Sequence, residues 1–327
     1  MSIGAQALRL AGFLSEQQFR SGEAIATVLG CSRTAVWKQV EQLRALGIAV
    51  TAVPGQGYRL EQPLELLDGK RIRAVMGKPA LARLAGLRVL ADIDSTNSAL
   101  LHVPPSERHG HALLAELQSG GRGRHGRRWH SPFGRNVYLS LGWRFEEGLA
   151  EMSCLPLVVA LAASHALDRA GLAGHGIKWP NDLVRDGAKL GGCLVEVQGD
   201  PQGPCHAVLG VGLNVHMRGA PGVQRIDRQW TDLGSLLPGV SRNVVAGLLL
   251  DELLVQLAAF AGQGFEPFRE AWQERDVLAG RTVTVQQAQV AVRGLARGIG
   301  PRGGLLLETR GVTTEHLAGE ASLGALA

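Results

Sequence analysis

The sequence contains little cysteine, and the few cysteines present are dispersed. Cys31, Cys154, Cys193 and Cys205 lie far apart in a chain of 327 residues, and none has the Cys-x-x-Cys spacing. This argues against a zinc site and against a disulfide framework. Dispersed cysteines are typical of proteins in a reducing cytosol, so we expect a cytoplasmic protein.

Long hydrophobic runs are also missing. Arg9 and Glu16 interrupt the N-terminal region, which therefore lacks the pattern of a secretory signal. The longest apolar stretch, 155–163, contains a proline and is too short to cross a bilayer. We expect this stretch to be part of a buried helix, and we expect no association with a membrane.

No internal repeat and no long low-complexity tract is present, and neither sign of charge dominates strongly. With 45% hydrophobic and 19% charged residues, the composition is that of a folded protein, and the length allows two or three domains. The formal net charge of +5 fits a partner rich in phosphate, such as a nucleic acid, but does not require one.

The first 62 residues have the pattern of a winged helix-turn-helix. Apolar residues at helical spacing predict three helices, with Ser32 capping the start of the third and Gly30 and Gly47 ending the second and third. Two extended stretches, 48–53 and 58–60, flank a Pro-Gly-Gln-Gly turn and predict the hairpin of a wing.

The start of the third predicted helix presents side chains that are suited to DNA. Arginine and lysine contact phosphates or guanine edges, and threonine contacts phosphate or a thymine methyl group. The residues that we expect to bind DNA are Ser32, Arg33, Thr34, Trp37 and Lys38. The alternative is a three-helix module that binds protein rather than DNA. Trp37 fits a position in the core of the module equally well.

Residues 61–70 are predicted to be a polar linker, and residues 63–275 an α+β domain. A hairpin within this domain turns at Asp186-Gly187. The strand after the hairpin, 208–215, contains two glycines, which indicates that another group approaches its backbone closely. The predicted strands are 87–90, 112–118, 136–143, 176–184, 189–197 and 208–215, and the predicted helices are 152–170 and those within 242–275.

The last 52 residues, 276–327, differ from the preceding domain in their sequence pattern. Short apolar strands separated by glycine turns predict a small β-barrel of the SH3-like kind. The expected fold is therefore α+β overall, with an N-terminal winged helix at 1–62, a mixed-sheet domain at 63–275 and a C-terminal barrel at 276–327.

A segment rich in glycine and arginine, residues 120–129, carries the clearest functional signal. Four glycines allow the backbone to approach a ligand closely, and four arginines offer planar donors for phosphate or carboxylate oxygens. This Gly/Arg segment lies between two predicted strands, so we expect a lid over an anion. A solvated basic loop or an RNA-binding tract is the alternative.

Several motifs occur together in one order and resemble those of the biotin–protein ligases. They are Ser95-Thr96-Asn97, Gln118 ahead of the Gly/Arg segment with Trp129, Lys178-Trp179-Pro180-Asn181-Asp182, Lys189-Leu190-Gly191-Gly192 and Gly210-Val211-Gly212-Leu213-Asn214. The winged helix in front is similar to that of the bifunctional members, which also repress biotin synthesis genes. The resemblance covers nearly the whole chain and implies a catalytic domain like those of class II aminoacyl-tRNA synthetases.

The resemblance implies an ATP-dependent reaction in two steps, through biotinyl-5′-AMP. Lys189, Arg124 and Asp182 are the implied catalytic residues, because two anions must meet in the first step and their charge must be offset. The implied biotin-binding residues are Ser95, Thr96, Asn97, Gln118, Arg122, Gly123, Arg124, Lys189 and Gly192.

The nucleotide site implied by the resemblance is mainly cationic and aromatic. Its residues are Arg122, Arg124, Arg127, Trp129, Asn181, Asn214 and Trp230. The flat face of Trp129 also suits biotin, and Trp230 is equally consistent with a tryptophan of the protein core. Asn181 and Asp182 are the candidate ligands of Mg²⁺, which prefers oxygen. Two positions depart from many relatives: His125 replaces a further arginine, and Gly324 stands where a basic residue is common.

The implied partners are a biotin carboxyl carrier protein of acetyl-CoA carboxylase and the operator DNA of biotin genes. Biotinyl-5′-AMP would also serve as corepressor, with a homodimer forming when it is bound. Two other functions stay open: a lipoate–protein ligase, and a regulator that senses biotin without ligating it. Competition between the two acids for adenylate formation distinguishes the first, and an assay of ligation the second.

Overall fold

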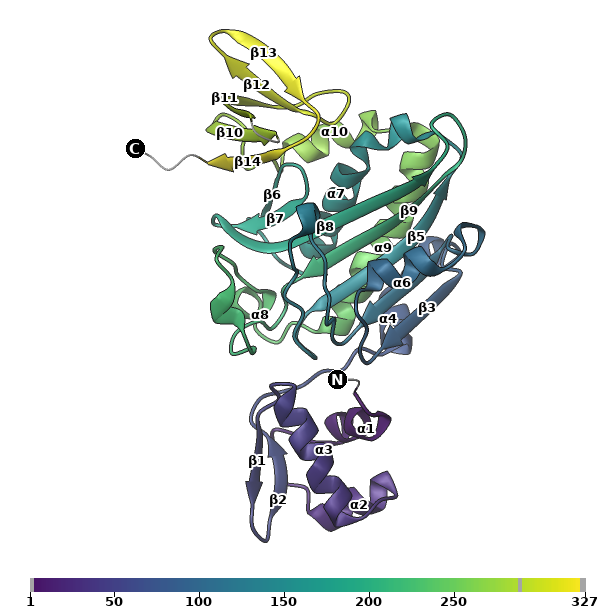
Figure 1. The fold of residues 1–327 in the computed structure, drawn as a ribbon, viewed down its shortest axis with the longest axis vertical. Coiled ribbons are helices and arrows are strands. Elements are labelled where there is room, and N and C mark those ends of the chain that lie inside the picture. The colour runs from purple at the N-terminus through teal and green to yellow at the C-terminus, as the bar shows by residue number, and fades with distance from the viewer. Residues whose placement is uncertain (1–2, 288–289, 324–327) are drawn as a thin grey trace.

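The computed structural model describes residues 3–287 and 290–323 and confirms the α+β fold with its three parts. Figure 1 shows these parts along the long axis of the molecule, with the winged helix at one end, a large sheet in the middle and a smaller sheet at the other end. Gly324 lies outside the described residues.

The N-terminal part is the predicted winged helix. Its elements are α1 (Ala5–Phe13), α2 (Gly22–Leu29), α3 (Arg33–Ala45), β1 (Val50–Val53) and β2 (Gly57–Leu60). The side chains of Ser21 and Ser32 accept hydrogen bonds from backbone amides in the first turns of α2 and α3, and Gly30 ends α2 in the left-handed conformation. Local cap chemistry therefore fixes the turn between the two helices.

The central part is a seven-stranded mixed sheet in the order β3-β4-β5-β9-β8-β7-β6, in which the β3–β4 pair is parallel and the other neighbours are antiparallel. The Gly/Arg segment joins β4 to its neighbour β5, as predicted. The strands are β3 (Gly86–Leu90), β4 (His111–Ala115), β5 (Val137–Phe145), β6 (Gly176–Lys178), β7 (Asp182–Arg185), β8 (Ala188–Gly199) and β9 (Cys205–Leu213).

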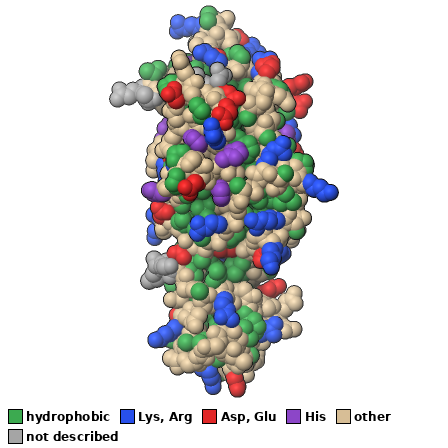
Figure 2. Space-filling model, turned by 90° about the vertical axis from the view of Figure 1, so that its right-hand side faces the viewer, with side chains coloured by type: hydrophobic (Ala, Val, Ile, Leu, Met, Phe, Trp, Pro, Cys, Tyr) green, Lys and Arg blue, Asp and Glu red, His purple; other side chains and the backbone are tan. Residues whose placement is uncertain are grey.

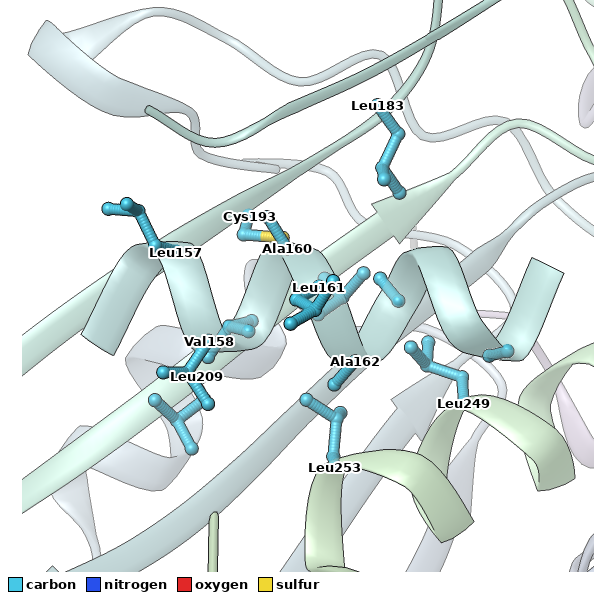
Figure 3. Packing of buried hydrophobic residues seen from close by; sticks show 14 of the residues in the cluster. Leu157, Val158, Ala160, Leu161, Ala162, Leu183, Cys193, Leu209, Leu249 and Leu253 are labelled. Carbon is cyan, nitrogen blue, oxygen red and sulfur yellow. The ribbon is translucent and has the colours of Figure 1, made fainter. Parts of the chain in front are cut away.

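Helices cover both faces of this sheet. Leu113 belongs to a small apolar cluster with α6 (Thr96–His102), whereas its neighbour Leu114 belongs to the main core, because successive side chains of a strand point to opposite faces. On the main-core side, α7 (Leu155–Arg169) packs against α9 (Arg242–Gln263), and Figure 3 shows Leu249 and Leu253 of α9 pointing toward α7 near Ala162.

By length and composition alone, α9 is apolar enough to cross a membrane. In the structure, 67% of its most apolar 18-residue window is buried inside the protein. Its neighbours are α7, β5 and the short helices α4 (Gly69–Val75) and α5 (Lys78–Leu81). The apolar surface of α9 therefore forms part of the core.

The segment that was predicted to be a polar linker is packed against the central domain and ends in α4. The Glu65 carboxylate accepts hydrogen bonds from the hydroxyl of Ser241 and the backbone of Arg242 at the start of α9. The Arg242 guanidinium is fully buried, lies 2.8 Å from the Glu116 carboxylate and donates to the Asn136 carbonyl. Sequence patterns missed this because polar residues between domains predict exposure to solvent.

Replacing Arg242 with methionine is expected to lower the free energy of unfolding by about 3–5 kcal/mol, because the buried Glu116 carboxylate would lose its counter-charge. Urea unfolding measures the change. A second variant that also carries Glu116→Gln should recover part of the loss, and equal stability of the two variants would contradict a charge-based penalty.

The C-terminal part contains a five-stranded antiparallel sheet in the order β13-β12-β11-β10-β14. This arrangement is compatible with the predicted SH3-like barrel. The helices α8 (Leu233–Leu236) and α10 (Glu266–Gln273) precede it, and its strands are β10 (Thr282–Gln287), β11 (Val290–Ile299), β12 (Leu305–Thr309), β13 (Val312–His316) and β14 (Glu320–Leu323).

Asp276 joins this part to the central sheet, where it pairs with Ile177 of β6. Burial raises the pKa of its carboxyl to about 6. Since the folded protein then holds the proton more tightly than the unfolded chain does, the stabilisation is complete below about pH 4 and is lost as the pH rises through about 6.

An Asp276→Asn variant should therefore gain stability over the original protein by about 1–3 kcal/mol as the pH rises from about 4 to 7. Urea unfolding at a series of pH values gives the difference directly. A difference that is independent of pH would contradict the assignment to Asp276.

The winged helix contacts the central domain at a narrow waist, where Figure 2 shows hydrophobic side chains in green. Phe133, which follows the Gly/Arg segment, is buried in the apolar cluster of the winged helix. Gly47, just after α3, lies against Pro221, and a Cβ atom at Gly47 would be 1.9 Å from the Cγ of that proline. The end of α3 therefore touches the segment that connects β9 to α8.

Candidate active site and DNA-binding face

A cleft of about 1450 Å³ opens beside β7, β8 and β9, between the Gly/Arg segment and the C-terminal sheet. Every residue that the sequence suggested for catalysis, biotin, nucleotide or Mg²⁺ lines it. These residues are Ser95, Thr96, Asn97, Gln118, Arg122, Gly123, Arg124, Arg127, Trp129, Asn181, Asp182, Lys189, Gly192, Asn214 and Trp230.

Part of the cleft lining is a network of neutral polar groups. Ser95 caps α6, and the Gln118 side-chain oxygen accepts hydrogen bonds from the backbone and the hydroxyl of Thr96, at 2.9 Å and 3.1 Å. The Gln118 amide in turn donates to the hydroxyl of Ser131, at 3.1 Å. These contacts hold donors and acceptors in fixed directions, as recognition of a polar head group requires.

The side chain of Asn97 forms its hydrogen bonds with other residues of the protein. Its amide donates to the Leu194 carbonyl and to the Glu196 carboxylate, and its side-chain oxygen accepts from the Ser140 hydroxyl. A Cβ atom at Gly210 would lie 2.3 Å from that oxygen. The glycine in β9 is therefore required by Asn97, which ties α6 to the sheet.

Within the cleft the Lys189 ammonium donates to the Asp182 carboxylate, with 2.5 Å between Nζ and Oδ1. The ammonium also lies 5.4 Å from the centre of the Trp129 ring, a distance at which a cation and an aromatic face attract. Trp129 lies close above Gly212, and its buried Nε1 donor has no hydrogen-bond partner among the described residues.

The Gly/Arg segment is folded over the cleft by contacts that differ from one arginine to the next. Arg122 pairs with Glu196 of β8, with 2.6 Å between Nη2 and Oε1. Arg124 donates to the Asn181 side-chain oxygen at 3.1 Å and to the Gly319 carbonyl. Arg127 pairs with Glu320 at the start of β14. The segment thus spans from the central sheet to the C-terminal sheet.

The nucleotide candidates also line the cleft, and the backbone and side-chain contacts of the protein hold several of them in place. The backbone of Lys189 pairs with that of Trp230, and the Asn214 amide donates to the Lys189 and Thr231 carbonyls. Asn181 uses its side-chain oxygen for Arg124 and its amide for the Cys193 carbonyl. Asn181 and Asp182 offer oxygen ligands, but within 3–287 and 290–323 no group of three acidic, histidine or cysteine side chains is placed to hold a metal.

Positive charge dominates the cleft. Its lining includes eight lysines and arginines but three carboxylates, those of Asp182, Asp227 and Glu320. Burial lowers the pKa of the Lys178 ammonium and of the Arg124 guanidinium. Although burial opposes it, the pKa of Glu320 is lowered by its hydrogen bond from Arg127 and by the nearby charges. The site is thus suited to an anionic ligand.

Among the charged residues of this site that sequence reasoning missed are Lys178, Arg228 and Glu320. Lys178 belongs to the Lys-Trp-Pro-Asn-Asp motif, but a lysine that flanks a turn is equally typical of the protein surface. Arg228 and Glu320 had no usable signal, because each is brought to the cleft by tertiary structure from a loop or from the C-terminal sheet.

The five candidate DNA-binding residues lie on the exposed start of α3. Ser32 acts as the helix cap, while Arg33, Thr34 and Lys38 are exposed. Trp37 has 54% of its surface exposed, so it does not lie in the core of the winged helix.

The fold and the site together define a class of protein. A winged helix presents a basic, exposed helix start, which is how this fold reads DNA. The central domain places a lysine–carboxylate pair, several arginines and a network of neutral polar groups around one cleft, an arrangement that stabilises developing negative charge. The protein is therefore a DNA-binding regulator joined to an enzyme that acts on anionic substrates.

Comparisons with known proteins identify the family. Residues 89–214 match the model of the biotin/lipoate A/B protein ligase family, and residues 7–59 match that of a helix-turn-helix domain. The bifunctional ligase/repressor BirA of Escherichia coli is 37% identical over 316 residues, covering 97% of this chain and 96% of that protein. Its counterpart in Bacillus subtilis is 31% identical, with 94% of each chain covered.

Comparison with solved structures supports the same family assignment. The biotin protein ligase of Aquifex aeolicus in complex with biotin and ATP has a TM-score of 0.63 and 29% identity, covering 73% of this chain and 98% of that one. The chain belongs to the family of bifunctional biotin ligase/repressors.

Proposed function

We propose that this protein activates biotin with ATP and transfers it to a lysine of an acceptor protein. The observation that carries the proposal is that one cleft is lined by the Lys189–Asp182 pair, by the polar network around Gln118 and by the arginines of the Gly/Arg segment. Ser95, Thr96 and Gln118 suit the ureido head of biotin, Gly192 lets the valeryl chain pass close to the backbone, and the cationic side suits the nucleotide.

In the first step a carboxylate oxygen of biotin bonds to the α-phosphorus of ATP, and the bond from that phosphorus to the bridging oxygen breaks. The electron pair of the broken bond leaves with pyrophosphate. Lys189 offsets the charge where carboxylate and phosphate meet, and Arg122, Arg124 and Arg127 hold the remaining phosphate oxygens. Asn214 and Trp230 support the nucleotide, and Trp129 offers its buried indole donor to the ligand.

Mg²⁺ fits this site as a partner of the nucleotide. It is commonly held by one or two protein oxygens together with substrate phosphates, and Asp182 and Asn181 supply such oxygens. When bound, the ion neutralises phosphate charge. The residues of the chain then orient the α-phosphate and exclude water from it.

In the second step an acceptor lysine, as the free amine, attacks the carbonyl of biotinyl-5′-AMP. The carbon–nitrogen bond forms, the bond from the carbonyl to the phosphate oxygen breaks, and AMP leaves with the electron pair. Asp182 is positioned to orient Lys189 or the incoming amine. The Gly/Arg segment shields the anhydride from water until the amine arrives.

The acceptor that we propose is the biotin carboxyl carrier protein of acetyl-CoA carboxylase, in the cytoplasm. We further propose that biotinyl-5′-AMP acts as corepressor, that the loaded protein forms a homodimer on the operator of biotin genes, and that the domains are 1–62, 63–275 and 276–327. The exposed residues Arg33, Trp37 and Lys38 support the DNA-binding part.

Incubation with biotin, ATP, Mg²⁺ and the apo-carrier should produce biotinylated carrier, detected as a mass increase of the carrier. Lipoate offered in equimolar competition should yield less adenylate than biotin does. Binding of biotin without any adenylate would instead identify a sensor, and a preference for lipoate would identify a lipoate ligase.

A further inference from the structure

Glu320 enters the cleft from β14, which Figure 1 shows beside β6 and β7 of the central sheet. Its carboxylate pairs with Arg127 of the Gly/Arg segment and lies 3.6 Å from Arg228 of the segment between β9 and α8. His125 is a more distant neighbour, at 3.9 Å. A single carboxylate is therefore shared by cations that come from two separate loops.

The charge around Glu320 is not balanced by that carboxylate. Arg124, which donates to the carbonyl of the preceding Gly319, and Lys178, which is partly buried in the cleft wall, add to Arg127 and Arg228. Asp182 is occupied by Lys189. The described lining thus holds eight lysines and arginines against three carboxylates, those of Asp182, Asp227 and Glu320, and desolvation makes this excess unfavourable unless a further anion enters.

We propose that Lys178 and Arg228, together with Arg127, form a subsite for the pyrophosphate end of the nucleotide, and that the Glu320 carboxylate occupies this subsite when no nucleotide is bound. The inference rests on the proposed function, since it assigns the end of ATP that the first step releases. It adds Lys178, Arg228 and Glu320 to that site.

The chemistry of the ligand matches the geometry. The β- and γ-phosphates carry most of the charge of ATP, and guanidinium groups bind such oxygens through paired, charge-assisted hydrogen bonds. Nucleotide entry exchanges one carboxylate for a more highly charged anion on the same cations. After the first step pyrophosphate departs, and Glu320 can return to Arg127 and Arg228 while AMP and biotin remain joined.

The first test is direct binding of inorganic pyrophosphate to the full-length protein by calorimetry at constant ionic strength, because surface charge pairs are screened by salt. Arg228→Ala should weaken binding by about tenfold, the loss of one charge-assisted contact. Glu320→Gln should tighten binding several-fold, since the competing charge is removed. Arg218→Ala is the matched control, because Arg218 is exposed on the same segment and does not line the cleft.

The second test separates the two steps of the reaction. Arg228→Ala should raise the KM for ATP in adenylate formation but leave transfer from preformed biotinyl-5′-AMP unchanged, because that intermediate has no pyrophosphate. Equal defects in both steps, or unchanged pyrophosphate affinity, would overturn the subsite. Weaker pyrophosphate binding by Glu320→Gln would overturn its role as a substitute anion. Absence of adenylate formation by the unaltered protein would instead refute the proposed function.

Discussion

Replacing Lys189 with alanine is expected to reduce the rate of adenylate formation by about 10²–10³-fold, the usual cost of removing one group that stabilises developing charge. The ammonium lines the same cleft as the polar network around Gln118 and the arginines, so in the proposed reaction its loss leaves the carboxylate and the α-phosphate to repel each other. The measurement is biotin-dependent release of pyrophosphate from ATP, with biotin binding followed separately.

Two controls make this result interpretable. Lys70→Ala removes the same charge from an exposed position on α4 and should have no effect on the rate. Because Lys189→Ala also leaves Asp182 without its partner, urea unfolding of Lys189→Ala and of the Lys189→Ala/Asp182→Asn double variant shows how much stability is lost. A full rate in a folded Lys189→Ala protein would remove the lysine from the mechanism.

Replacing both Arg33 and Lys38 with alanine is expected to weaken binding to duplex DNA by about 10–100-fold and to leave ligation unchanged. Each basic residue that contacts a phosphate contributes roughly one unit to the slope of log affinity against log salt concentration, so the slope should fall by about two. Fluorescence anisotropy with a labelled duplex at several salt concentrations measures both quantities.

The matched control is the double variant Lys70→Ala/Arg73→Ala, which removes the same charge from the exposed side of α4. It should keep the original affinity and slope. If both double variants lose DNA binding equally, the effect comes from net charge, and α3 is not the DNA-reading helix. If neither loses it, DNA binding by this face of the winged helix is refuted.

Local chemistry allowed much of the fold to be predicted. Ser32 caps the helix that it precedes, Gly30 ends the helix before it, and Asp186 and Gly187 both adopt the positive φ angles that a tight hairpin requires. Each of these depends on a few neighbouring residues. Short-range patterns of this kind were therefore enough to predict the β7–β8 hairpin and the position of the Gly/Arg segment between two strands.

What escaped prediction depends on contacts between distant segments. The burial of Arg242 beside Glu116 and the approach of Glu320 to Arg127 join residues more than a hundred positions apart. The strands β13 and β14 gave no alternation strong enough to be recognised, because few of their side chains are buried. The exposure of Trp37 could not be predicted either, because helical periodicity alone does not show whether this side chain faces the core or the solvent.

The contact between Gly47 and Pro221 limits how freely the DNA-reading half can be exchanged between proteins. A graft of another winged helix that brings any side chain to position 47 would collide with Pro221, at a site where the backbone also has a positive φ. The loop beginning at Pro221 continues along the substrate cleft. Grafting a winged helix with another DNA specificity therefore also requires a compatible residue in the enzyme at position 221. Positions 47 and 221 should be altered together.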